Sequence, residues 1–458
     1  MTRACPLFPT EVWKPVSVAG LGRPGLSGLW LMACLLMSAA GRSAGDPFEQ
    51  ELKRVNAVLV KGEPARALPL AQDVLRRATD PGAVANAAYL AQCALRQLER
   101  PDEIGPMYKK LLEKQPDNWG LVRQNAVWQL YGGQFGAALE GLKRGLDPSD
   151  PLASDPGTWL RPLSMCYVGL GNLEEANRCF SRARAEAGGA RAQYEQDAKK
   201  VFAERLAKPS DPAVCLKFVK EVILSKHSPI EPCHAAAAKE LREALKIPGL
   251  PAALELECTF QMATSLHESR QYVPAAEAFA TAASLASRMP AADRGQHLGL
   301  SLFNQGYSLA KAKEWDKAIE VFNALIQSGV DDRDPGGHIM ETNRNYRHRA
   351  ALEISKCYEA KADYRAAYGW AVRARDQYQS VSCCGTCQEN SRERLNRRLD
   401  ELAARAGGIL RARHAVSSGL VWRRWYVWTP AIGALAVASW LLRRRCLRAR
   451  RRLTGPPQ

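Results

Sequence analysis

The stretch from residue 157 to 190 reads GTWLRPLSMCYVGLGNLEEANRCFSRARAEAGGA. Large apolar residues recur at helical spacing before Gly171, and the small residues Ala176 and Ala183 follow it, also at helical spacing. Small side chains allow two helices to approach closely, which leaves Phe180 to fill the gap toward the next unit. Gly171 can adopt the positive φ that a tight turn between the helices requires. The stretch therefore predicts a hairpin of two antiparallel helices.

The same arrangement recurs along the chain. Two copies, 85–118 and 119–152, adjoin with a period of 34 residues, the period of the tetratricopeptide repeat. The chain thus resembles the tetratricopeptide repeat (TPR) family. The resemblance implies an all-α fold, an α-α superhelix (solenoid) of about seven TPR-like helical hairpins. The hairpins are expected at 48–81, 85–118, 119–152, 157–190, 256–289, 299–332 and 348–381.

Two hairpins depart from the pattern at one position of the first helix, where the repeat usually has a small residue. Val55 stands there in the first hairpin and Gln92 in the second. We expect these two hairpins to pack more loosely or in an altered register.

The spacing of large and small residues that defines the repeat, which we call the repeat frame, is not recognisable between 191 and 255. This stretch contains six prolines. We expect two or three helices there, for example at 192–207 and 235–246, which join an N-terminal array (48–190) to a C-terminal array (256–381). A degenerate eighth hairpin is the alternative.

At the beginning of the chain, charged, apolar and small residues follow one another in the order that is typical of a secretory signal peptide. Scattered positive charges precede the apolar run LSGLWLMACLLMSAA at 26–40, and small residues follow it. Cleavage after Ala40 or after Ala44 fits equally well, so residues 1–44 are assigned to the signal peptide. An uncleaved anchor helix is the alternative.

A second uncharged run, WYVWTPAIGALAVASWLL at 425–442, is about as long as a single membrane-spanning helix must be. Seven arginines follow in the tail 443–458 and account for much of the net charge of +17. This bias predicts a cytoplasmic tail and an extracytoplasmic repeat domain, joined by a Cys-containing helix and a juxtamembrane stem at 382–424. A buried helix of a soluble domain is the alternative. No basic stripe marks the folded part, so nucleic acid is not an expected partner.

The sequence contains no catalytic constellation, because the hydrolase, metalloprotease and nucleotide-binding motifs are all missing. We therefore expect no enzyme activity, no cofactor, no metal site and no small-molecule substrate. Cys384 and Cys387 form a C-x-x-C that follows the last hairpin. In an oxidising compartment a structural disulfide between them is favoured. Thiol–disulfide exchange in an envelope protein, metal or cofactor ligation, free thiols and pairing with Cys357 are the alternatives.

The expected function is a membrane-anchored scaffold that binds other proteins, as a member of a membrane-associated complex. If the frame is right, one face of the first helices lines the concave groove of the superhelix. Arg and Tyr are enriched at binding hot spots, so we predict that a partly acidic partner segment binds there. The predicted partner-binding residues are Asn86, Tyr89, Arg96, Arg123, Tyr131 and Arg161.

Overall fold

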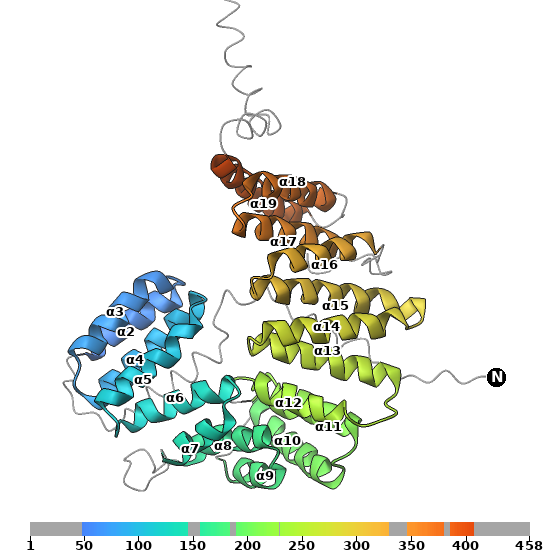
Figure 1. Cartoon of the computed structure of the whole chain (residues 1–458). Coiled ribbons are helices and arrows are strands. Elements are labelled where there is room, and N and C mark those ends of the chain that lie inside the picture. The colour runs from blue at the N-terminus through green and yellow to red at the C-terminus, as the bar shows by residue number, and fades with distance from the viewer. Residues whose placement is uncertain are drawn as a thin grey trace, which may run out of the picture. The chain divides into compact units, whose positions relative to one another are not determined.

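The computed structural model describes residues 48–144, 156–183, 189–228, 230–328, 346–379 and 385–406. All regular structure in these residues is helical, and most helices form antiparallel neighbours (Figure 1). The chain divides into two compact units, residues 1–312 and residues 313–458. We call them unit 1 and unit 2.

Unit 1 contains fourteen α-helices, a 3₁₀ turn (η2) and a short π-helical turn (η3) among its described residues. The first hairpins and their turn consist of α2 (Glu49–Val60), α3 (Pro64–Arg77), α4 (Pro81–Gln97), η2 (Pro101–Glu103), α5 (Ile104–Lys114), α6 (Trp119–Tyr131), α7 (Phe135–Arg144), α8 (Pro156–Leu170) and α9 (Leu173–Arg182). They are followed by α10 (Gly189–Ala207), α11 (Pro212–Phe218), η3 (Val219–Ile223), α12 (His234–Ala244), α13 (Ala252–Glu268), α14 (Tyr272–Ser287) and α15 (Ala291–Lys311). The described part of unit 2 consists of α16 (Trp315–Gln327), α17 (Tyr346–Ala360), α18 (Tyr364–Gln379) and α19 (Gly385–Ala406).

Every predicted hairpin has its turn at the same place. A residue with positive φ stands at the fifteenth position of each one, as Gly171 does in 157–190. In most of these turns the following amide also bonds back to a carbonyl in the last turn of the first helix, as Asn172 does to Tyr167 at 2.9 Å. This is a Schellman arrangement, which satisfies carbonyls at the helix end. The turn residues are Gly62, Glu99, Gly133, Gly171, Arg270, Lys313 and Ala362.

The close approach of the paired helices also recurs in register. The twentieth position of every hairpin is fully buried, and six of the seven residues there are alanine. An alanine at this point keeps the backbones close without leaving a void. The all-α, TPR-like helical hairpins predicted from the sequence are therefore confirmed within each unit for the described residues. The twentieth residues are Ala67, Ile104, Ala138, Ala176, Ala275, Ala318 and Ala367.

The second hairpin keeps the common register in spite of Gln92, so the altered register considered for it is wrong. Gln92 is buried, and its side-chain oxygen accepts a hydrogen bond of 2.6 Å from the hydroxyl of Tyr108. Tyr108 is itself fully buried on α5. The polar group is therefore satisfied inside the hairpin, as a buried amide must be. Val55 is likewise buried in the core of the first hairpins.

The connector 191–255 is part of the core of unit 1. Its aromatic residues continue the core from α9, with ring centroids 5.1 Å apart for Phe180–Phe202 and 4.8 Å apart for Phe202–Phe218. Helix α12 packs on both α8 and α13. The boundary between the compact units lies at 312/313, inside the predicted C-terminal array and outside this connector.

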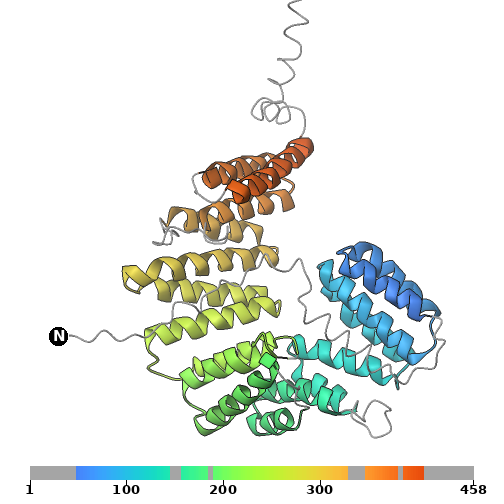
Figure 2. The ribbon, with the colours of Figure 1, turned by 180° about the vertical axis from the view of Figure 1, so that it is seen from behind.

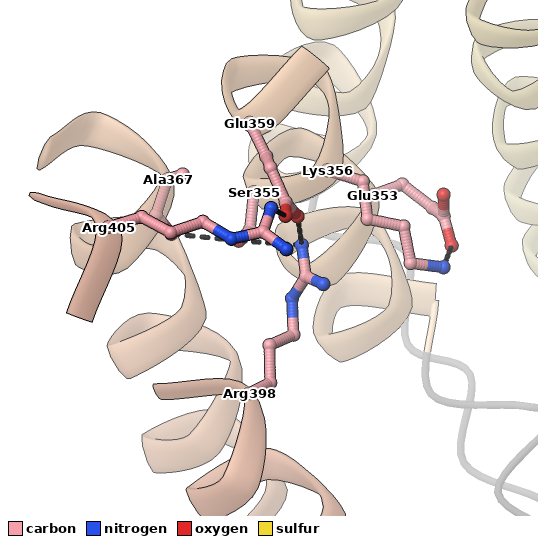
Figure 3. Close-up of polar contacts among 7 residues, drawn as sticks. All are labelled: Glu353, Ser355, Lys356, Glu359, Ala367, Arg398 and Arg405. Carbon is pink, nitrogen blue, oxygen red and sulfur yellow. Dashed lines mark hydrogen bonds and ion pairs between the residues drawn. The ribbon is translucent and has the colours of Figure 1, made fainter. Parts of the chain in front are cut away.

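Helix α19 covers the end of the last hairpin (Figure 2). Its leucines, among them Leu399 and Leu402, are buried in a cluster with Ala367 and Ala371 of α18. Glu359 of α17 accepts hydrogen bonds from Arg398 at 2.8 Å and from Arg405 at 2.6 Å, both on α19 (Figure 3). A polar helix of this kind can close a repeat array by shielding its last apolar face from water.

Three predicted segments lie outside the described residues: the signal peptide (1–44), the membrane span (425–442) and the tail (443–458). Among the helices that the structure does describe, none combines the length and the apolar character needed to cross a bilayer.

Candidate protein-interaction surface

Arg123 and Arg161, which we predicted to contact a partner, are buried in the core of unit 1. Only 1% of Arg123 is exposed, and its guanidinium lies over the ring of Trp159, 4.8 Å from the centroid. Arg161 is 6% exposed and forms a salt bridge with Glu195 of α10. In this structure neither guanidinium faces solvent, so both hold helices together.

The other predicted residues lie closer to the surface. Asn86, Tyr89 and Tyr131 are half-buried, the first two on α4 and the third at the end of α6. Burial raises the pKa of Tyr131 well above its ordinary range, and the nearby Glu231 carboxylate raises it further. Burial also raises the pKa of Tyr89, with further contributions from Cys93 and Glu231. Both phenols therefore stay protonated and can donate hydrogen bonds.

Arg96 is the one predicted arginine that remains exposed, with 41% of its side chain accessible. Its Nη1 lies 3.3 Å from Oε1 and 3.2 Å from Oε2 of Glu231, which belongs to the segment before α12. The cation that we expected to attract an acidic partner is thus paired with an acid of the same chain. The prediction that these six residues bind a partner stays a prediction.

A second group of aromatic and charged residues lies on α13–α15. The Nδ1 of His267 is 2.8 Å from the hydroxyl of Ser308, which itself donates to the carbonyl of Asn304 at 2.8 Å. Nδ1 therefore donates to that hydroxyl, which leaves Nε2 as the acceptor nitrogen of a neutral ring. The His267 ring packs against Tyr272 and Tyr307, with centroids 5.3 and 5.4 Å apart.

Lys311 completes this group. Its ammonium lies 5.7 Å from the centroid of the Tyr307 ring and 3.0 Å from Oε1 of Glu99. Glu99 stands in the turn that follows α4, so this ion pair links that turn to α15 within unit 1.

The repeat frame could have identified the second group. His267 occupies the twelfth position of its hairpin, as Arg96 does, and Lys311 occupies the thirteenth, as Tyr131 does. Equivalent positions on first helices face the same side of a stacked array. The predicted partner-binding residues come only from the N-terminal hairpins, so His267 and Lys311 are not among them.

Seven cysteines of the described residues are free: Cys93, Cys166, Cys179, Cys215, Cys233, Cys258 and Cys357. Burial raises the pKa of Cys93 to about 11 and that of Cys233 and Cys357 to about 12. Such thiols are poor nucleophiles. Cys357 is unpaired, so the alternative that it joins a disulfide is wrong for this structure. Cys384 lies outside the described residues, as does the side chain of Cys387.

No family model matches the sequence, and no significant match is found among curated proteins. Several solved structures of helical repeats are similar to the chain. One is the signal transduction ATPase with numerous domains and a tetratricopeptide repeat sensor from Pyrococcus horikoshii, at 17% identity and a TM-score of 0.34. The match covers 86% of this chain and 55% of that protein, so the chain spans about half of its length.

Two further structures are similar over most of the chain. Yeast Tom70 matches at 12% identity and a TM-score of 0.28, covering 80% of this chain and 66% of that one. A Rap protein complexed with competence and sporulation factor matches at 13% identity and a TM-score of 0.26, covering 78% of this chain and 97% of that one.

Proposed function

We propose that this protein is a scaffold that binds segments of other proteins on one surface of unit 1. This surface, which we call the clasp surface, consists of Tyr89, Arg96, Glu99, Tyr131, Glu231, His267, Tyr272, Tyr307 and Lys311. The observation that supports the proposal is that charged and aromatic residues share positions on first helices, Arg96 and His267 at the twelfth and Tyr131 and Lys311 at the thirteenth. Tyr and Arg dominate binding hot spots because they combine a large contact area with directed hydrogen bonds.

Site-specific photocrosslinking tests this proposal. A photoreactive phenylalanine analogue replaces Tyr131 or Tyr307 in the full chain, and the adducts formed in cells are identified by mass spectrometry. We expect both positions to capture the same protein. The control is Arg178, whose side chain is 67% exposed on α9, a second helix that contributes no residue to the clasp surface. Equal capture of that protein from Arg178 would contradict the proposal.

The proposal includes the location inferred from sequence: a repeat domain outside the membrane, an anchor at 425–442 and a cytoplasmic tail. The support is the order of charged and apolar runs at the two ends of the chain. The full chain should resist alkaline extraction from membranes, and a chain truncated after residue 424 should be released. Recovery of the full chain in the soluble fraction would remove the anchor from the proposal.

A further inference from the structure

Two cations of the clasp surface are each paired with a glutamate from a distant part of unit 1. Arg96 pairs with Glu231, which follows it by 135 residues. Lys311 pairs with Glu99, which precedes it by 212 residues. Arg96 lies in the last turn of α4, and Glu99 lies two residues beyond the end of that helix, so both ion pairs involve the C-terminal end of α4.

Both ion pairs are accessible to solvent. The side chains of Arg96 and Glu231 are 41% and 36% exposed, and those of Lys311 and Glu99 are 28% and 75% exposed. Exposed ion pairs contribute little to stability, because water and salt screen them. A carboxylate from outside can therefore replace either glutamate at small cost.

The turn after α4 positions the side chain of Glu99. Glu99 has a φ of 58°, and the same turn position is also left-handed at Arg270, Lys313 and Ala362, so the conformation is a general feature of these helix ends. Glu99 differs from these three residues in carrying a carboxylate, whose Oε1 lies 3.0 Å from the ammonium of Lys311.

Tyrosines lie near both cations. Burial raises the pKa of Tyr89 and of Tyr131, the Glu231 carboxylate raises it further, and the Arg96 guanidinium lowers it. Burial also raises the pKa of Tyr272, on which Lys311 and Glu99 act in opposite directions, and the Lys311 ammonium lies 5.7 Å from the centroid of the Tyr307 ring. Flat aromatic side chains beside a cation suit a peptide that brings carboxylates together with apolar side chains.

We propose that Arg96 and Lys311 bind two carboxylates of an acidic segment of a partner protein. Glu231 and Glu99 are the resident carboxylates that this segment replaces. The inference rests on the proposed function, because it assigns a chemistry to the partner of the same surface. Carboxylate binding is thus assigned to Arg96 and Lys311, which solvent reaches. It is no longer assigned to Arg123 and Arg161, which are buried.

Fluorescence anisotropy of the full chain in detergent tests the inference, with a labelled hexaglutamate peptide as the probe. The variant Glu99→Gln/Glu231→Gln removes both resident carboxylates and keeps the side-chain size. We expect it to bind the probe about fivefold more tightly than the unmodified chain, as the loss of two weak competing pairs implies. Arg96→Gln/Lys311→Gln should lose this binding.

The matched control is Glu63→Gln/Glu175→Gln, which changes the net charge by the same amount. These glutamates pair with Arg66 and Arg178, three residues further along the chain in each case, and none of the four residues belongs to the clasp surface. Equal gains in the two double glutamate variants, or undiminished binding by Arg96→Gln/Lys311→Gln, would overturn the inference. Glu99→Gln/Glu231→Gln could bind the probe no more tightly than the unmodified chain while position 131 still crosslinks a partner. In that case the partner segment is not acidic, and the proposed scaffold function stands.

Discussion

The hydroxyl of Ser164 donates a hydrogen bond of 2.7 Å to the carbonyl oxygen of Ala176, across the closest approach of α8 and α9. Ser355 forms the same bond with Ala367 at 2.8 Å, between α17 and α18. Both serines are fully buried and stand at the eighth position of their hairpins. In both hairpins the bond thus joins the serine at the eighth position, on the first helix, to the buried alanine at the twentieth position, on the second helix.

Replacement of either serine by alanine should weaken its hairpin. Alanine fits the space and removes one buried hydrogen bond at Ser164, and at Ser355 it also removes the 3.5 Å bond that Arg398 donates to the hydroxyl oxygen. We expect Ser164→Ala and Ser355→Ala each to cost about 0.5–1.5 kcal/mol of unfolding free energy. Urea denaturation followed by circular dichroism measures the change. Ser287→Ala is the control, because Ser287 donates a similar bond to Ser284 on an exposed helix surface. An equal loss there would contradict a special role for the buried bonds.

The turn residues predict opposite effects for glycine and alanine. Ala362 has a φ of 60°, so Ala362→Gly should relieve backbone strain and stabilise unit 2 by roughly 0.5–1 kcal/mol. Gly171 has a φ of 82°, and no atom lies within 4 Å of a Cβ built on it, so Gly171→Ala should destabilise unit 1 by about 1 kcal/mol through the backbone alone. Thermal melting of the full chain measures both.

Gly105→Ala serves as the control for the turn variants. Gly105 is also surrounded by open space but lies within α5 at an ordinary φ, where alanine is the better helix former. We expect this variant to be neutral or stabilising. A destabilisation as large as that of Gly171→Ala would show that the turn conformation is not the cause.

Gly169 permits the packing of α8 against Phe135. A Cβ built on Gly169 would lie 2.3 Å from Cδ1 of Phe135, which is far inside a van der Waals contact. The ring must move, so Gly169→Ala should cost about 1–3 kcal/mol, as overpacking does. The second variant Phe135→Leu removes the obstacle. The double variant should therefore be more stable than the sum of the two single effects predicts, and simple additivity would refute the contact as the cause.

The hairpins could be predicted because their determinants are local. The small residues at Ala138, Ala176 and Ala275 and the turn glycines at Gly133 and Gly171 are visible in the sequence at fixed spacing. Arg270 and Ala362 are not turn residues by type, and only the frame places them in turns. The register follows from the whole pattern, since no single residue determines it.

The candidate site could be predicted only in part, because its contacts are not local. Tyr89, Arg123 and Arg161 share the fifth position of their hairpins and appear equivalent in the sequence. Their environments differ, because Trp159 covers Arg123 and Glu195 pairs with Arg161. Glu195, like the Glu231 that pairs with Arg96, belongs to the connector, where the repeat frame gives no positions. The sequence pattern therefore could not show which of these three side chains remain accessible to solvent.

His234 and His267 should make unit 1 sensitive to acid. Burial is the main cause that lowers the pKa of each to about 4, and Lys311 contributes for His267. The imidazole pKa in an unfolded chain is about 6.5, so between pH 6.5 and 4 the unfolded state binds protons that the folded state excludes. The stability from the neutral rings is therefore complete above pH 6.5 and is lost as the pH falls toward 4. Because both rings are partly solvated, we expect the pair to account for roughly 1–2 kcal/mol.

Thermal melting of the full chain between pH 7 and 4.5 measures this loss. The double variant His234→Asn/His267→Asn cannot take up these protons, so its melting temperature should fall less steeply with acid than that of the unmodified chain. Asparagine at 267 retains an amide donor for Ser308, which limits the structural damage. The control His227→Asn alters an exposed residue and should leave the slope unchanged. Identical slopes for the double variant and the unmodified chain would show that these histidines carry no part of the acid sensitivity.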